Sequence, residues 1–199
     1  MSSSESCLPS SMNTRLILAS ASARRKKILA ALGAEFDVAV PEIKEVFYES
    51  NARRTARENA VLKNAWCMVR YPECYSLAAD TTIEFEGRCV TKARTCDEAI
   101  GFLRMFSGTT HVVYTAVALA RPRTEPELIM AKSSVRFRTL SEDDIQTYVA
   151  KVNPMDRAGA YDIDEQGEML IDGYTGSRTT IMGLPNEIVR AWLKKEGLL

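Results

Sequence analysis

Two serines and two arginines cluster where an apolar strand is predicted to turn into a helix. The strand Leu16–Ala19 is followed by Ser20, Ser22, Arg24 and Arg25, and a helical apolar pattern starts immediately after them. Backbone N–H groups at a helix N-terminus attract anions, and guanidinium groups bind phosphate oxygens in a planar, bidentate way. These residues predict a polyphosphate-binding turn, although they lack the lysine and glycine spacing of a P-loop. The alternative is an ordinary N-cap serine followed by solvated cations.

The carboxylate of Asp80 is the second group that could do chemistry. It follows a short apolar strand predicted over 75–79. Open α/β sheets place their working groups just past the carboxyl ends of strands. The alternative is a turn aspartate without a chemical role. A catalytic role for Asp80 requires that it face the cations Arg24 and Arg25.

Two lysines and two glutamates could complete a site for phosphate and a divalent ion. Lys63 lies on a predicted helix and Lys92 follows a predicted hairpin, so either could be a point charge for phosphate. Glu42 and Glu45 follow a short strand and could help Asp80 to hold Mg²⁺. This ion needs only one or two carboxylates beside phosphate oxygens and waters. Solvated lysines and an ordinary acidic loop are the alternatives.

The single histidine, His111, restricts the chemistry further. Metal sites and acid–base schemes that need two histidines are excluded. A general base at neutral pH would then be a carboxylate near a metal ion, or a metal-bound water. His111 itself lies in a strand pattern and is expected to be structural. The acidic cluster of Asp162, Asp164 and Glu165 lacks the spacing of a calcium loop.

The charge balance favours a small anionic ligand over a long polyanion. The 199 residues carry 26 basic and 26 acidic side chains, with a formal net charge of +0. Nucleic-acid and membrane-surface binders usually have a basic excess, so we expect no nucleic-acid partner. No apolar stretch is long enough to cross a bilayer, and we expect no membrane partner either.

The cysteines and the first residues predict a reduced, cytoplasmic protein with one folded domain. The five cysteines have no C-x-x-C spacing, which argues against a disulfide framework and a structural zinc site. The Ser-rich residues 1–13 lack the apolar core of a signal peptide and are expected to be a disordered extension. Residues 14–199 are expected to form a single α/β domain.

Hydrophobic periodicity predicts strands and helices that position these residues. Strands are expected over 16–19, 36–40, 75–79, 110–120 and 128–140, with a hairpin around Glu86-Gly87. Helices are expected after Ser22, over about 51–70 with Asn51 as N-cap, after the capping box Thr95-x-x-Glu98, after Ser141 and from about Pro185. One face of the helix over 51–70 is expected to carry Ala52, Ala56, Ala60, Ala65, Met68 and Val69.

Eight short segments together are more specific than any of these residues alone. They are Ala19-Ser20-Ala21-Ser22-Ala23-Arg24-Arg25, Ile43-Lys44-Glu45, Lys63-Asn64, Ala79-Asp80-Thr81, Thr91-Lys92-Ala93, Leu103 to Val113, Ala158-Gly159-Ala160-Tyr161 and Gly183-Leu184-Pro185. In this order they resemble the Maf family of nucleoside triphosphate pyrophosphatases from about residue 15 to residue 197.

The resemblance implies a mixed twisted sheet flanked by helices with a central cleft, similar to the inosine triphosphate pyrophosphatases. It implies hydrolysis of (deoxy)nucleoside triphosphates to monophosphate and pyrophosphate, which would remove non-canonical nucleotides. The implied cofactor is Mg²⁺, with Mn²⁺ and Co²⁺ as alternatives, and the implied assembly is a homodimer. The implied catalytic residues are Asp80, Glu45, Lys63 and Lys92, with Asp80 and Glu45 on the metal. The implied substrate-binding residues are Ser20, Ser22, Arg24, Arg25, Thr81 and Asp164.

Four residues depart from the pattern of the family. Ala23 and Ala93 stand where proline is usual, and Lys44 stands where an acidic residue is common. Asp164 replaces the glutamine that helps to recognise the base in the family. The last departure bears on which base this chain prefers.

Arg25 and Thr81 resemble the subgroup that acts on dTTP, UTP and modified pyrimidine nucleotides. The implied reaction is attack of water on the α-phosphorus, with cations on the triphosphate and the metal on Asp80 and Glu45. Two alternatives remain open: a non-catalytic nucleotide-binding module that regulates cell division, and a phosphatase that releases orthophosphate from the γ position.

Overall fold

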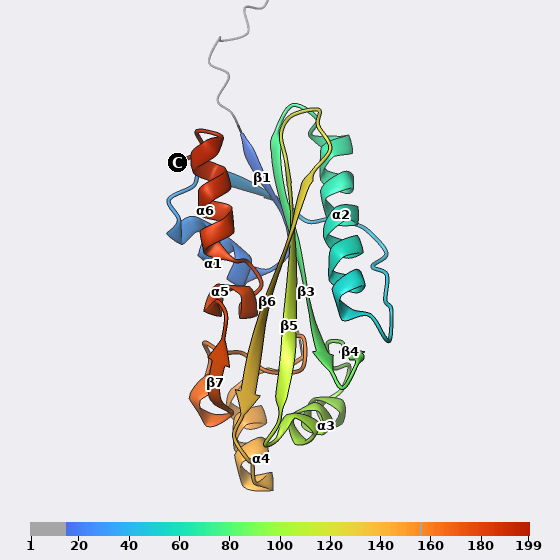
Figure 1. Cartoon of the computed structure of the whole chain (residues 1–199), viewed down its shortest axis with the longest axis vertical. Coiled ribbons are helices and arrows are strands. Elements are labelled where there is room, and N and C mark those ends of the chain that lie inside the picture. The colour runs from blue at the N-terminus through green and yellow to red at the C-terminus, as the bar shows by residue number, and fades with distance from the viewer. Residues whose placement is uncertain (1–14, 156) are drawn as a thin grey trace, which may run out of the picture.

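The computed structural model describes residues 15–155 and 157–199. The extension predicted over residues 1–13 lies outside the described residues. The described chain is elongated, with long strands along its length and helices on both sides (Figure 1).

One mixed sheet forms the centre of the fold and confirms the predicted α/β class. Its strands are β1 (Leu16–Ala19), β2 (Phe36–Ala39), β3 (Tyr75–Phe85), β4 (Arg88–Val90), β5 (Thr110–Ala120), β6 (Glu127–Phe137) and β7 (Ile171–Thr175). They lie in the order β2-β1-β3-β5-β6-β7, and β4 pairs with one end of β3. β1 is parallel to β2 and β3, and the other described strand pairs are antiparallel.

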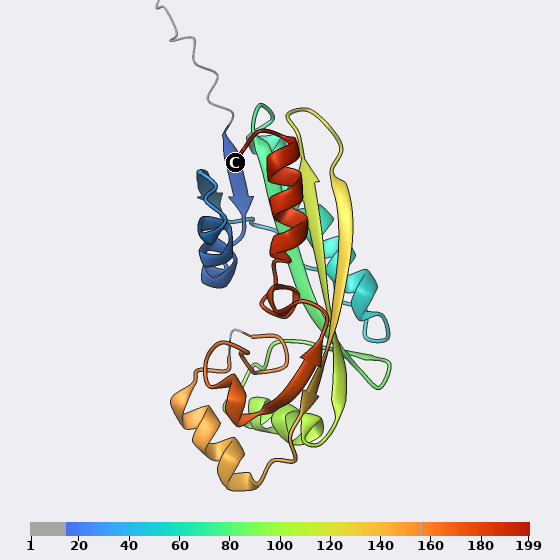
Figure 2. The same ribbon diagram turned by 60° about the vertical axis from the view of Figure 1, so that its left-hand side comes forward.

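The helices lie on the two faces of this sheet and at one of its ends. They are α1 (Ala23–Ala31), α2 (Ala52–Arg70), α3 (Cys96–Phe106), α4 (Glu142–Lys151), α5 (Arg178–Ile181) and α6 (Asn186–Lys195), with a 3₁₀ turn over Gly167–Met169. α1 and α6 lie on one side of the long strands and α2 on the other (Figure 1). α3 and α4 lie at one end of the sheet, beside β4 and β7 (Figure 2).

Two hydrophobic cores share the long strand β3, which carries a polar stretch between them. β3 contributes Leu77 and Ala79 to the core under α1 and α6. Further along, it contributes Ile83 to the core beside α3 and α4. The polar residues Asp80, Thr81 and Thr82 lie between these positions. β3 therefore carries three consecutive polar residues at the junction of the two cores.

The prediction that a strand ends just before Asp80 is wrong. β3 continues to Phe85, and Asp80 pairs in register with Ala116 of β5. The parallel neighbour β1 does end here, because its last pair joins Ala19 to Ala78. Asp80 thus lies just past the carboxyl end of β1, while the antiparallel ladder with β5 keeps its own strand extended.

The predicted face of α2 is correct in its first half only. Asn51 caps the helix by accepting from Arg54 N, and Ala52, Ala56 and Ala60 are buried as predicted. Ala65 and Val69 are exposed instead, and Met68 is only partly buried. The second half of the helix buries Asn64 and Cys67.

The cause of this error is a polar residue on the buried face of α2. The amide nitrogen of Asn64 donates to the carbonyl of Ala118 and to the hydroxyl of Ser76, both at 3.1 Å. Hydrogen bonding removes much of the cost of burying an amide. An assignment based on apolar residues alone could not identify this face.

Some element boundaries also differ from the predictions. β6 ends at Phe137 rather than at residue 140, because Arg138 N donates to Leu170 O outside the ladder. The carboxylate of Glu98 accepts from Arg94 N, so the predicted capping box is only half formed. β7 and α5 were not predicted. β7 contains Gly173 and polar residues, and α5 is a single turn.

His111 is a buried structural residue, as expected. Its Nε2 lies 2.8 Å from the hydroxyl of Tyr161, and its ring packs against Phe106 and Phe137. Within the described chain its Nδ1 has no hydrogen-bond partner. Burial lowers the pKa of His111 from 6.5 to about 4. The folded protein therefore holds this imidazole neutral.

We expect His111 to make the folded state less stable as the pH falls from about 6.5 to about 4. In this window the unfolded chain binds a proton that the folded chain does not, so the free energy of unfolding decreases with decreasing pH. The loss attributable to His111 reaches about 3 kcal/mol at the lower end. Urea unfolding at a series of pH values measures it, with His111→Gln as the comparison. Identical pH dependence in both proteins would contradict the expectation.

Among the described helices, none combines the length and the apolar character needed to span a membrane.

Candidate active site

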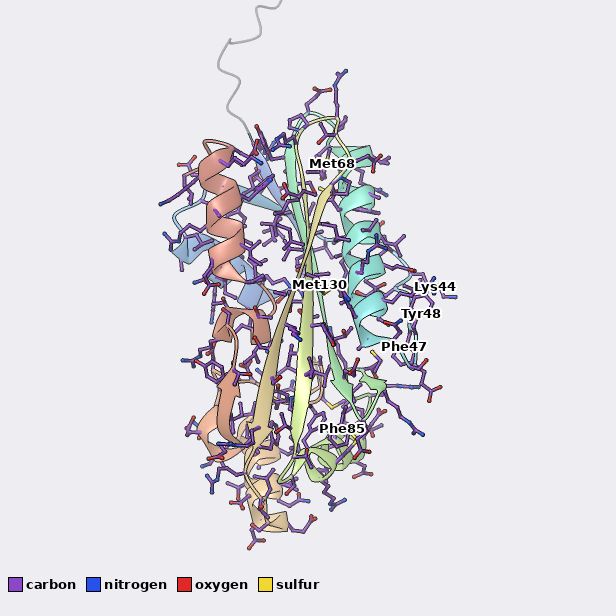
Figure 3. All side chains as sticks on the ribbon, in the orientation of Figure 1. Lys44, Phe47, Tyr48, Met68, Phe85 and Met130 are labelled. Carbon is purple, nitrogen blue, oxygen red and sulfur yellow. The ribbon has the colours of Figure 1, made fainter. Side chains whose placement is uncertain are left out.

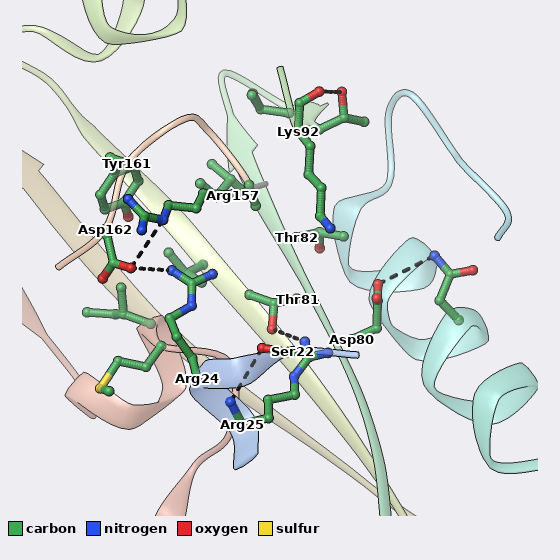
Figure 4. Close-up of a pocket in the computed structure, with 18 of the residues that line it drawn as sticks. Ser22, Arg24, Arg25, Asp80, Thr81, Thr82, Lys92, Arg157, Tyr161 and Asp162 are labelled. Carbon is green, nitrogen blue, oxygen red and sulfur yellow. Dashed lines mark hydrogen bonds and ion pairs between the residues drawn. The ribbon is translucent and has the colours of Figure 1, made fainter. Parts of the chain in front are cut away.

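A cleft of about 870 Å³ lies at the junction of the two cores. Most of the predicted site residues line it, although they come from distant parts of the chain: Ser22, Arg24, Arg25, Glu45, Lys63, Asp80, Thr81 and Lys92. The close-up shows Arg25 of the turn beside Thr81 and Asp80 of β3 (Figure 4). Asp80 thus shares a cavity with Arg24 and Arg25, as its predicted catalytic role requires.

The serines at the start of α1 shape the turn. Ser22 is the N-cap and its hydroxyl accepts from Arg25 N at 3.4 Å. The hydroxyl of Ser20 accepts from Ser22 N at 3.1 Å. Ser22 is therefore an N-cap residue, as the alternative interpretation expected, and Ser20 holds the backbone just before the helix. Because they fix the first turn of α1 at the cleft, Arg24 and Arg25 are presented to it.

Arg25 is held by three partners from three parts of the chain. It donates to the carbonyl of Gly183 at 2.8 Å, to the hydroxyl of Thr81 at 3.0 Å and to the hydroxyl of Ser20 at 3.5 Å. Thr81 in turn lies 3.0 Å from the hydroxyl of Thr115. Burial lowers the pKa of Arg25, and the charge of Asp80 opposes that effect. The guanidinium is thus a fixed positive group beside the Asp80 strand.

Lys63 joins the two carboxylates that were predicted to bind metal. Its ammonium lies 2.6 Å from Asp80 Oδ1 and 2.6 Å from Glu45 Oε1. Burial raises the pKa of Asp80, and the charges of Lys63 and Arg25 only partly oppose this. Burial also acts to raise the pKa of Glu45, but Lys63, Lys92 and Arg25 outweigh it, and the pKa of Glu45 is lowered.

Lys92 and Arg157 enter the cleft from segments that pair with each other. The backbone of Lys92 forms an antiparallel bridge with Ala158, and Gly159 N donates to Thr91 O at 3.0 Å. The Lys92 side chain extends into the cleft toward the strand that carries Asp80 (Figure 4). This pairing explains why a lysine after a hairpin and a distant glycine loop belong to one site.

Asp162 holds two arginines on one side of the cleft. Its Oδ2 accepts from Arg24 at 2.8 Å and lies 3.3 Å from Nε of Arg157. Asp162 is only 3% exposed, and its backbone N–H donates to the hydroxyl of Tyr148. Neither Asp162 nor Arg157 was assigned to the site from the sequence. The signal that could have found Arg157 is its position next to the Ala158-Gly159-Ala160-Tyr161 segment.

Two predicted site residues, Ser20 and Asp164, do not line the cleft, and the structure directs Asp164 elsewhere. Its carboxylate pairs with Arg178 at 2.6 Å, and its N–H donates to Asp162 Oδ1 at 2.8 Å. It is not among the residues that line the cleft, whereas Asp162 and Ile163 are. A role for Asp164 in base recognition stays a prediction.

Asn59 of α2 was also not predicted, and it links the two carboxylates. Its Oδ1 accepts from Val46 N at 2.8 Å and its Nδ2 donates to Val46 O at 3.1 Å. The same Nδ2 lies 3.4 Å from Asp80 Oδ2. Asn59 is 2% exposed and lies one helical turn before Lys63. It therefore fastens the segment that carries Glu45 next to Asp80.

Replacing Asn59 by alanine should lower turnover by about 10- to 100-fold, because residues that orient catalytic ligands have effects of this size. Asn64→Ala is a matched control. It removes an equally buried amide from the same helix, but one that does not line the cleft. Both variants should have a lower melting temperature than the wild type. At a temperature where both variants are folded, only Asn59→Ala should have a lower turnover. Equal losses of turnover would show that Asn59 is merely structural.

The carboxylates of the cleft suit a hard divalent cation only if further oxygen ligands also bind it. No group of three or more His, Cys, Asp or Glu residues that could hold a metal exists among the described residues. Asp80 and Glu45 do lie close enough to contact one ammonium group. Mg²⁺ accepts one or two carboxylates when phosphate oxygens and waters complete its shell. Lys44, which replaces a common acidic residue, is exposed and points outward (Figure 3).

The fold is shared with a solved protein of very different sequence. The Ham1 protein of Staphylococcus aureus superposes with a TM-score of 0.55 at 12% identity, over 92% of this chain and 99% of that chain. The chain is thus an α/β protein with a Ham1-type fold and a cleft lined by cations and two carboxylates. It belongs to the Maf family: the family model described as Maf-like protein matches residues 15–196.

Curated relatives cover nearly the whole chain. It is 36% identical over 185 residues to the dTTP/UTP pyrophosphatase of Thermotoga maritima, which spans 92% of this chain and 90% of that protein. It is 38% identical over 190 residues to the dTTP/UTP pyrophosphatase of Myxococcus xanthus, spanning 93% and 94%. These matches confirm the resemblance seen in the eight segments.

Proposed function

We propose that this protein hydrolyses nucleoside triphosphates to the monophosphate and pyrophosphate, with dTTP and UTP as its main canonical substrates and modified pyrimidine nucleotides as further ones. The observation that carries the proposal is the common cleft of Asp80, Lys63 and the two arginines of α1. The two relatives named dTTP/UTP pyrophosphatase support the substrate.

The cations of the cleft would hold the triphosphate. Arg24 and Arg25 lie at the N-terminus of α1, where the helix dipole also favours anions, and Lys92 extends from the other side. Fixed cations stabilise the charge that spreads over the phosphoryl oxygens in the transition state. Arg25 suits this role because its three hydrogen bonds fix it before the substrate arrives.

Asp80 and Glu45 would hold the divalent ion, for which we propose Mg²⁺, with Mn²⁺ and Co²⁺ as alternatives. When bound, such an ion neutralises phosphate charge and makes water more acidic. Asp80 would accept the proton of the attacking water. The new bond joins the water oxygen to the α-phosphorus, and the bond to the oxygen between the α and β phosphates breaks. Pyrophosphate leaves with that oxygen. The homodimer and the cytoplasmic location stay predictions.

A nucleotide panel tests this function. The full chain is incubated with Mg²⁺ and dTTP, UTP, CTP, ATP, GTP or a 5-substituted dUTP, and both pyrophosphate and orthophosphate are measured. We expect pyrophosphate without orthophosphate, fastest with the uracil and thymine nucleotides. Orthophosphate together with the diphosphate would favour a γ-phosphatase. Nucleotide binding without products would favour the non-catalytic module.

A further inference from the structure

The ammonium of Lys63 occupies the space between the two carboxylates that would bind metal. It lies 2.6 Å from an oxygen of each, and the side chains of Lys63 and Asp80 are only 12% and 11% exposed. Glu45 is more open, with 55% of its side chain exposed. A cation is thus already bound at the place where a divalent ion would have to approach both residues.

Both oxygens of Asp80 have partners in this arrangement. Lys63 contacts Oδ1, and the amide of Asn59 lies 3.4 Å from Oδ2. These two donors come from adjacent turns of α2, so they contact the carboxylate from one side. A metal ion that binds Asp80 would share this carboxylate with the ammonium of Lys63, and the two positive charges repel each other.

The wider surroundings are positive as well. The charges of Lys92 and Arg25 both act on Glu45, and Arg25 also acts on Asp80. In the absence of an anion, a divalent ion would enter next to three cations. A triphosphate reverses this balance, because its oxygens can accept the hydrogen bonds of Lys63 and can themselves bind the metal.

We propose that Lys63 is the resident counter-ion of the Asp80–Glu45 pair, and that the divalent ion binds there only together with the nucleotide. The phosphate oxygens take over the ammonium, and the two carboxylates become available to the metal. Lys63 then has two successive partners, first the carboxylates and afterwards the triphosphate. This inference rests on the proposed function, but it concerns the order of binding and not the reaction.

The test measures metal binding without nucleotide and without turnover. Mn²⁺ is titrated into the full chain and free Mn²⁺ is followed by electron paramagnetic resonance. We expect no saturable Mn²⁺ binding to the wild type, and we expect Lys63→Met to bind one Mn²⁺ with an affinity at least about tenfold above the upper limit found for the wild type, because a like charge in contact with the site has been removed. Lys27→Met is the matched control. It removes an exposed cation that lines the same cleft and should leave the affinity at the wild-type value.

Further variants separate the possible outcomes. Adding Asp80→Asn to Lys63→Met should abolish the gain in affinity, and Lys63→Gln serves as the second neutral variant if Lys63→Met does not fold. Saturable Mn²⁺ binding to the wild type alone, lost on Asp80→Asn, would overturn the proposal. Equal affinities of Lys63→Met and Lys27→Met would do the same. Pyrophosphate release by the wild type in the nucleotide panel is independent of all these results, so it separates a failure of this inference from a failure of the function.

Discussion

Replacing Asp80 by asparagine should lower the rate of pyrophosphate release by at least about 10²-fold, which is the effect expected for loss of a general base. Asparagine keeps the size of the side chain and can still contact Asn59 and Lys63. It can neither accept a proton from water nor balance a divalent ion. The rate is measured with dTTP and UTP at saturating Mg²⁺.

The same substitution should not destabilise the protein. Burial raises the pKa of Asp80 in the folded state above 3.8. Between the two pKa values the folded chain binds a proton that the unfolded chain lacks, so stability falls as the pH rises through this window. At neutral pH the buried charge of Asp80 therefore lowers the free energy of unfolding, and asparagine removes this charge. We expect the melting temperature of Asp80→Asn to equal or exceed that of the wild type.

The control for Asp80→Asn is the same substitution at an exposed position. Asp172→Asn removes a surface carboxylate that pairs with Arg136, and neither residue lines the cleft. It should change neither the rate nor the melting temperature, because exposed ion pairs contribute little. If Asp80→Asn keeps near-normal turnover, Asp80 is not the group that activates water, and the assignment of the site fails.

Gly159→Ala should destabilise the protein by about 3 kcal/mol or more. Gly159 has a φ of +68°, a conformation that favours glycine. A Cβ there would lie 2.5 Å from Ile83 and 2.9 Å from Phe106, both of which belong to the core beside α3 and α4. The substitution therefore combines backbone strain with a steric clash. Urea unfolding measures the loss.

Substitutions at two other glycines distinguish the cost of backbone strain from the cost of a steric clash. Gly33 has a φ of +87° and Gly101 lies within α3, and a Cβ on either meets no atom within 4 Å. Gly33→Ala should cost about 1 kcal/mol from strain alone. Gly101→Ala should stabilise the helix by about 0.5–1 kcal/mol. A loss for Gly159→Ala no larger than that for Gly33→Ala would show that the core adapts to the methyl group.

Gly159 also shows why the site depends on this packing. Its N–H donates to Thr91 O, next to Lys92, and its neighbours in the chain include Arg157 and Asp162. A loop displaced by a methyl group would shift cations on two sides of the cleft. We therefore interpret the glycine as a residue that sets the distance between these segments.

The local elements around the chemical groups could be predicted because their signals are local. A run of apolar residues before Ser20, a serine in the N-cap position and Gly33 after the last turn define β1 and α1. The hairpin at Glu86-Gly87 follows from Gly87, because glycine adopts the positive φ of such turns at little cost. Most of the site residues predicted from the eight short segments do line the cleft, because the order of these segments can be read from one sequence.

The role of Asn59 and the true length of β3 could not be predicted in this way. Asn59 is an ordinary polar residue on a helix, and only its contacts with Val46 and Asp80 distinguish it from a solvent-facing asparagine. Likewise, the strand that carries Asp80 stays extended because β5 pairs with it, although even the nearest pair, Glu84 and Val112, is separated by the 27 residues from 85 to 111. Neither partner is near in sequence.

The amino-acid sequence by itself determined which chemical groups are present, and in what local setting: capping serines, paired arginines, two lysines and two carboxylates on predictable elements. Only the tertiary structure decided how these groups are paired. It placed Lys63 between Asp80 and Glu45, and it directed Asp164 to Arg178 outside the cleft lining. The physical reason is that capping and periodicity act within a few residues, whereas ion pairing in a cleft depends on which distant segments the sheet brings together.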